Sequence, residues 1–153
     1  MKTMSRIAPI ALRSLFGLMF TVAGAVGLFH LGPQPEHTGA AAAFAGGLAA
    51  SGYFFPMLKS IELVAGLLLL SGRLVPLTLV VLAPIVVNIA AFHFLLAPEG
   101  AIVAALLVAA EAGLAWMHRD AFAPLLRWTG SPVDRAEEGA SHLSELGTHA
   151  GPA

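Results

Sequence analysis

Four apolar stretches, almost free of charged residues, constrain this chain more than any other feature. They lie at about residues 14–31, 56–70, 75–96 and 101–117. A helix needs roughly 20 apolar residues to cross the hydrocarbon core of a bilayer, and these stretches approach or reach that length. Of the residues, 58% are hydrophobic and 11% are charged, against about 25% charged in an ordinary soluble domain. The sequence therefore predicts an all-α polytopic membrane protein, a bundle of four transmembrane helices in the lipid bilayer.

The predicted membrane domain covers residues 1–128. After the first span, a Gly-Pro-Gln-Pro sequence at 32–35 breaks the helix, because proline lacks an N–H donor and glycine frees the backbone. The alanine-rich stretch at 38–50 is too short and too weakly apolar to cross the membrane, so we expect a short interfacial helix there. Residues 129–153 are rich in glycine, serine, proline and acidic residues, which predicts a disordered cytoplasmic tail.

Positive charges predict the orientation of the spans. Apart from Lys59, all basic residues fall on one side, whereas the two loops on the other side carry Glu36 and Glu99. These basic residues are Lys2, Arg6, Arg13, Arg73, Arg119, Arg127 and Arg135. Loops rich in lysine and arginine stay in the cytoplasm. We therefore expect both termini to be cytoplasmic.

Composition also excludes several functions. The net charge of −1 gives no electrostatic basis for binding nucleic acid. The chain has no cysteine, which excludes disulfides, thiol catalysis and thiolate metal sites within it. The sequence contains no Ser-His-Asp order, phosphate-binding loop or dinucleotide fingerprint, so no catalytic motif is present and an enzymatic activity stays undecided.

Polar residues within or beside the spans are the candidate ligand-binding residues. They are Glu62, Asn88, His93, Glu111, Lys59, His30 and Tyr53. With a rise of about 1.5 Å per helical residue, Glu62, Asn88 and His93 reach similar depths in the outer half of the bundle, and Glu111 lies just below. An intramembrane acid marks a candidate functional site. These depths predict a polar pocket whose carboxyl and imidazole groups could relay protons to a quinone-like ligand.

Structural roles are the alternative for the same residues. Lys59 and Glu62 could pair along their own helix, with Lys59 reaching outward to the interface. Asn88 could form a hydrogen bond between helices, and the histidines could be interfacial. A metal site built from His30, His93 and Glu62 lacks the ligand spacing of known motifs, so we predict no metal.

Several motifs resemble the DoxX family of bacterial membrane proteins, over about residues 12–126. They are Gly52-Tyr53-Phe54-Phe55-Pro56 followed by Lys59, Glu62 and Gly66; Val75-Pro76-Leu77; Ala83-Pro84 through Asn88-Ile89; Phe92-His93; Leu96 through Gly100; and Glu111 with Ala115-Trp116 and Arg119 through Phe122. The resemblance implies a four-helix bundle in the bacterial cytoplasmic (inner) membrane. It also implies a link to redox chemistry and quinones, since a subunit of a thiosulfate:quinone oxidoreductase gives the family its name.

Three functional hypotheses follow from these observations. The first is a quinone- or redox-linked membrane subunit or accessory protein with the polar pocket as its binding site. The second is a non-catalytic scaffold that recruits a soluble redox enzyme through the acidic tail and the amphipathic piece at 122–128. The third is a transporter of a small solute, which four spans without an inverted repeat could form only as a homo-oligomer.

Overall fold

The computed structural model describes residues 4–32 and 36–126, and the predicted tail at 129–153 lies outside them. Within these ranges all regular structure is helical, which confirms the all-α prediction. The elements are α1 (Met4–Leu28), α2 (Gly39–Ala50), α3 (Phe54–Ser71), α4 (Val75–Leu95), the 3-10 helix η1 (Pro98–Gly100), α5 (Ala101–Met117) and α6 (Arg119–Leu126).

Four segments of the described chain are long and apolar enough to cross a membrane. They are Ile7–Leu28, Phe54–Ser71, Val75–Leu95 and Pro98–Met117. Large apolar side chains cover their outer surface; Leu15, Leu95 and Ile102 are 68%, 79% and 77% exposed. A soluble monomer rarely exposes so extensive an apolar surface, whereas lipid tails cover it without cost. The predicted polytopic membrane bundle is confirmed.

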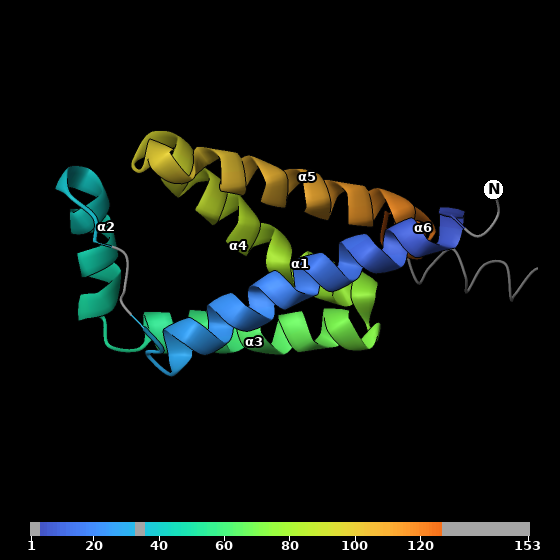
Figure 1. Ribbon diagram of the computed structural model, residues 1–153, viewed down its shortest axis with the longest axis horizontal. Helices are drawn as coiled ribbons and strands as arrows, with labels where there is room; N and C mark the ends of the chain where they lie inside the picture. The colour runs from blue at the N-terminus through green and yellow to red at the C-terminus, as the bar shows by residue number, and fades with distance from the viewer. Residues whose placement is uncertain (1–3, 33–35, 127–153) are drawn as a thin grey trace, which may run out of the picture. The chain divides into compact units, whose positions relative to one another are not determined.

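The spans form a ring in which each helix has two neighbours. α1 packs against α3 and α5, and α4 packs against the same two helices. Neighbours run antiparallel, so α1 begins at the end of the bundle at which α3 and α5 finish (Figure 1). Buried apolar side chains fill the interior, among them Phe16, Phe20, Leu69, Leu82 and Leu114.

The short helix α2 lies at one end of this ring and runs across the direction of α1 and α3 (Figure 1). We call this end the α2 end. Its bounds, Gly39–Ala50, agree to within one residue with the short helix predicted at 38–50. Glycines with positive φ stand at both of its ends, Gly39 at 60° and Gly52 at 74°, where a side chain would be strained. The chain can therefore turn sharply into and out of α2.

The first span differs from its predicted bounds. The prediction began at residue 14, but α1 begins at Met4 and continues through Pro9. The reason is that residues 7–12 are apolar and continue the helix toward the N-terminus. The charge of Arg13 does not interrupt a helix, so it does not mark the start of α1. At the other end, His30 has a φ of 54° and the Leu31 N–H donates to the Val26 carbonyl at 3.0 Å. This hydrogen bond closes the helix earlier than predicted.

The chain divides into two units after Arg119, and α6 occupies the start of the second. α6 ends at Leu126, so it includes most of the amphipathic piece predicted at 122–128, and the remainder of that piece lies outside the described residues. The site below lies wholly in the first unit.

Glycines allow α1 and α3 to approach closely. A Cβ atom added to Gly24 would lie 2.5 Å from the backbone nitrogen of Leu63, and one added to Gly66 would meet the backbone of Thr21. Gly17 and Gly27 face α3 in the same way. The small residues of α1 form the face of this helix that packs against α3.

Candidate functional site

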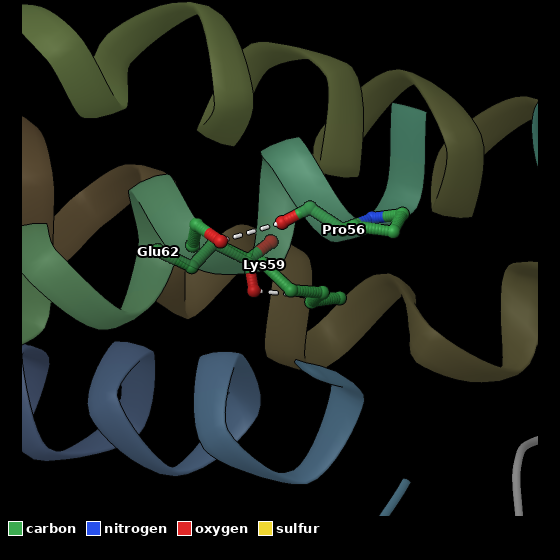
Figure 2. A network of polar contacts seen from close by, with 4 residues as sticks. Pro56, Lys59 and Glu62 are labelled. Carbon is green, nitrogen blue, oxygen red and sulfur yellow. Dashed lines mark hydrogen bonds and ion pairs between the residues drawn. The ribbon is translucent and has the colours of Figure 1, made fainter. Parts of the chain in front are cut away.

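An ion pair on α3 provides two of the charged groups of the candidate site. Lys59 Nζ lies 2.7 Å from Glu62 Oε2, and the two residues are separated by one helical turn (Figure 2). The Glu62 side chain is 3% exposed and that of Lys59 is 23% exposed. A buried carboxylate needs such a partner, since an unpaired charge in an apolar interior costs several kcal/mol.

Gly27 on α1 makes room for this pair. A Cβ atom at Gly27 would lie 2.6 Å from Cδ and 2.8 Å from Cγ of Lys59. The aliphatic stem of the lysine therefore crosses the α1 backbone where no side chain intervenes. This packing holds the ammonium group beside Glu62 on the bundle side of α3, where the stem is buried and the charge is paired.

A cavity of about 200 Å³ lies between α2, α3 and α4, and we call it the aromatic cavity. Its lining includes Lys59, Glu62, Asn88 and His93, four of the predicted site residues. Four phenylalanines also line it: Phe44, Phe54, Phe55 and Phe92. Hydrogen-bonding groups and aromatic faces therefore surround one space, an arrangement typical of small-molecule sites.

His93 is fixed in orientation at the end of α4. Its Nδ1 lies 3.0 Å from the carbonyl oxygen of Ala97, and a carbonyl can only accept, so Nδ1 carries the hydrogen of this bond. A Cβ atom at Gly100 would clash with the imidazole ring, which shows how closely the ring packs on that turn. The second ring nitrogen, Nε2, makes no hydrogen bond to the described residues. A ligand in the cavity could use it.

Asn88 brings an unsatisfied polar group to the cavity wall. Its side chain is exposed and forms no hydrogen bond with the part of the chain that the structure describes. A side-chain amide carries two donors and a carbonyl acceptor, and leaving them unpaired at membrane depth is unfavourable. The predicted interhelical hydrogen bond of Asn88 is not formed among these residues, so its amide is available to a ligand.

Phe92 connects α2 to α4 beside the cavity. Its ring centroid lies 5.1 Å from that of His37 and 5.7 Å from that of Phe44, the latter on α2. It also lies 5.2 Å from the His93 ring. These edge-on and tilted contacts are favourable geometries for aromatic pairs. They hold the α2 segment over the ends of α3 and α4.

A second cavity, of about 550 Å³, lies between the end of α1, α2 and the start of α3. We call it the histidine–lysine cavity, because His30, His37 and Lys59 line it. Small residues make up much of the remaining wall: Gly27, Ala45, Gly46 and Ala49. Lys59 and His37 belong to the walls of both cavities.

Three predicted site residues lie away from the aromatic cavity. Glu111 is buried on α5, 9% exposed, and does not belong to the cavity lining. Its Oε1 has no hydrogen-bond partner among the described residues. Tyr53 precedes α3 and is 66% exposed, outside both cavities. His30 lines only the second cavity. Among the described residues, no group of three or more histidines and acids is arranged to hold a metal ion.

The sequence interpretation missed His37, Phe44 and Phe92 as parts of the site. Phe44 and Leu48 are spaced i,i+4 on α2 and both line the aromatic cavity, so that spacing was an available signal for a face directed at the bundle. His37 lies in a connection, and no periodicity predicts where such a residue packs.

The fold and cavities define an integral membrane protein of four spans with a small polar and aromatic cavity at the α2 end. Comparison of the chain with protein-family models, with curated proteins and with solved structures finds no match. The resemblance to the DoxX family stays a prediction.

Proposed function

We propose that this protein binds the head of a small lipophilic redox molecule of the quinone class in the aromatic cavity. One observation carries the proposal: five hydrogen-bonding side chains and four phenylalanines, contributed by α2, the segment before it, α3 and α4, surround one space. Aromatic faces suit a flat conjugated ring. Polar groups at a few points of an apolar wall determine how such a ring is oriented.

The volume of the aromatic cavity is large enough for a single ring but too small for a larger ligand. This volume is about 200 Å³, below the roughly 300–1,000 Å³ of sites for drug-sized ligands. A single quinone ring could occupy it, while its apolar tail would extend along the lipid-facing surface. A ligand delivered from the bilayer suits a cavity in a membrane-spanning bundle.

Unused hydrogen-bonding groups match the chemistry of a quinone and its quinol. The Asn88 amide and the remaining N–H groups of Lys59 can donate to a quinone carbonyl, and Nε2 of His93 can accept from a quinol hydroxyl. The fixed Nδ1 of His93 keeps Nε2 available, the arrangement by which a histidine takes up and releases protons. Under this proposal the chain is a binding subunit or accessory protein of the DoxX type, and a partner oxidoreductase supplies or removes the electrons.

Equilibrium dialysis of the detergent-solubilised full chain against a short-chain ubiquinone analogue tests the proposal. Asn88→Leu should weaken binding about fivefold, since a lost hydrogen bond of about 1 kcal/mol corresponds to about a factor of five in affinity. Val87→Leu is the matched control, because Val87 is 66% exposed on the same helix and does not line the cavity. Equal binding by wild type and Asn88→Leu, or equal loss in the control, would refute the proposal.

We also propose that the α2 end faces away from the cytoplasm, in the bacterial inner membrane. Arg73 and Arg119 stand at the opposite end, whereas Glu99 stands at the α2 end, in keeping with the positive-inside rule. The absence of cysteine makes the test direct. A membrane-impermeant maleimide should label Ser51→Cys in intact cells and Ser71→Cys only after lysis; the reverse pattern would invert the topology.

A further inference from the structure

The histidine–lysine cavity brings hydrogen-bond donors together from three segments. His30 follows the end of α1, His37 precedes α2, and Lys59 belongs to α3. Each imidazole carries at least one N–H, and Lys59 has three donors, of which one binds Glu62. No carboxylate belongs to the cavity lining among the described residues. The wall therefore offers donors and a cationic group to an acceptor-rich, anionic ligand.

The ends of the spans predict that this cavity lies at the headgroup level of a bilayer. His30 lies two residues beyond Leu28, the last residue of the first span, and Lys59 lies in the second turn of α3. The helix α2, which completes the wall, runs across the ends of the spans (Figure 1). Phosphate groups of lipids occur at this depth, and lysine side chains near helix ends reach toward it.

Small residues keep this cavity open. A Cβ atom added to Gly46 would have no neighbour within 4 Å, and the other small members of the wall are Gly27, Ala45 and Ala49. The resulting volume of about 550 Å³ exceeds that of a bare phosphate ion and leaves room for a phosphate ester with its glycerol.

We propose that the histidine–lysine cavity binds an anionic phosphate, and that its occupant is the headgroup of an anionic phospholipid. His30, His37 and the free N–H groups of Lys59 donate to the phosphate oxygens. Charge-assisted hydrogen bonds of this kind are the stronger ones in proteins. The inference does not depend on quinone binding, because His30 and Gly46 line this cavity and not the aromatic one.

Two variants separate this site from the aromatic cavity. His30→Asn withdraws the imidazole, and asparagine tolerates the positive φ of 54° at this position. Gly46→Leu fills the cavity without removing a charge. Gly47→Leu is its matched control, since a Cβ atom there also meets nothing within 4 Å and Gly47 lies in neither cavity wall. Both leucine variants increase helix propensity equally.

Native mass spectrometry of the full chain in detergent tests the proposal, with phosphatidylglycerol and phosphatidylcholine of identical acyl chains as probes. Wild type should retain phosphatidylglycerol at lower concentration than phosphatidylcholine. His30→Asn should weaken retention of phosphatidylglycerol about tenfold, as expected for one lost charge-assisted hydrogen bond. Gly46→Leu should weaken it by at least as much, because the leucine side chain occupies the space of the headgroup. Gly47→Leu and Asn88→Leu should behave as wild type.

A second measurement, the stabilisation of the protein by inorganic phosphate, distinguishes a lipid headgroup from free phosphate as the ligand. Stabilisation of wild type by phosphate alone, lost in His30→Asn, together with no preference for phosphatidylglycerol, would support the phosphate site and identify free phosphate as its ligand. The proposal would be overturned if wild type retained the two lipids equally and phosphate did not stabilise it. It would also be overturned if Gly46→Leu and Gly47→Leu lost retention of phosphatidylglycerol equally.

Discussion

The ammonium nitrogen of Lys59 lies 2.7 Å from Oε2 of Glu62, three residues further along α3. Lys59 and Glu62 form an ion pair within a membrane-spanning helix. The glutamate side chain is almost wholly buried, and the lysine side chain is partly exposed. Breaking a buried pair by removing one partner costs more than removing both, because the remaining charge stays unpaired.

We therefore predict strong coupling between these two residues. Glu62→Gln and Lys59→Met should each lower the unfolding free energy, and the double variant should lose less than the sum, with a coupling free energy of about 1–3 kcal/mol. Unfolding in mixed detergent micelles gives the unfolding free energy of wild type, the two single variants and the double variant. Ser60→Ala, an exposed neighbour, should change stability little; strict additivity would show that the pair is energetically unimportant.

Gly24 should tolerate no larger residue. A Cβ atom there would lie 2.5 Å from the backbone nitrogen of Leu63, so Gly24→Ala forces α1 and α3 apart, and overpacking of this kind costs typically about 1–3 kcal/mol. Gly47→Ala has open space around it and should be neutral or stabilising by about 0.5–1 kcal/mol. Thermal unfolding of both variants in one detergent gives the comparison; an unchanged Gly24→Ala would contradict the close contact.

Glu111 should behave oppositely to Glu62. Its Oε1 is buried and without a partner among the described residues, and an unsatisfied buried polar group costs about 1–3 kcal/mol. Glu111→Leu, similar in size, should therefore raise the unfolding free energy by about 1 kcal/mol, whereas Glu62→Leu should lower it. Destabilisation by Glu111→Leu would indicate that this carboxyl group has a partner that the folded chain alone does not supply.

Gly100 should control the orientation of His93. The imidazole occupies the space that a Cβ atom at Gly100 would need, so Gly100→Ala must displace the ring from its hydrogen bond with Ala97. We expect Gly100→Ala to weaken quinone binding about tenfold. Gly113→Ala is the control, because its Cβ atom would meet Leu12 at an ordinary distance of 3.6 Å. If both variants bind like wild type, His93 has no part in the site.

The sequence predicted the spans and the α2 helix within a few residues, except at the start of α1, because long apolar runs and the breaks between them are local features. Depth along each helix was also predictable and correctly suggested that Glu62, Asn88 and His93 meet. Glu111, predicted to lie just below them and to line the same pocket, lies outside the aromatic cavity, since depth leaves the rotation of a helix about its axis undetermined. That rotation depends on packing, here on Ala104, Leu107 and Leu114, which are buried on the same face of α5 as Glu111.

Lys59 stands in the wall between the two cavities and has a fixed number of donors, one of them committed to Glu62. A phosphate in the histidine–lysine cavity that accepts hydrogen bonds from the remaining N–H groups of Lys59 leaves fewer of them for a quinone carbonyl in the aromatic cavity. Occupancy of the two cavities is then thermodynamically linked, and each ligand weakens the other by the same factor. Under the two proposals, the anionic lipid content of the membrane would set the affinity of this protein for its redox ligand.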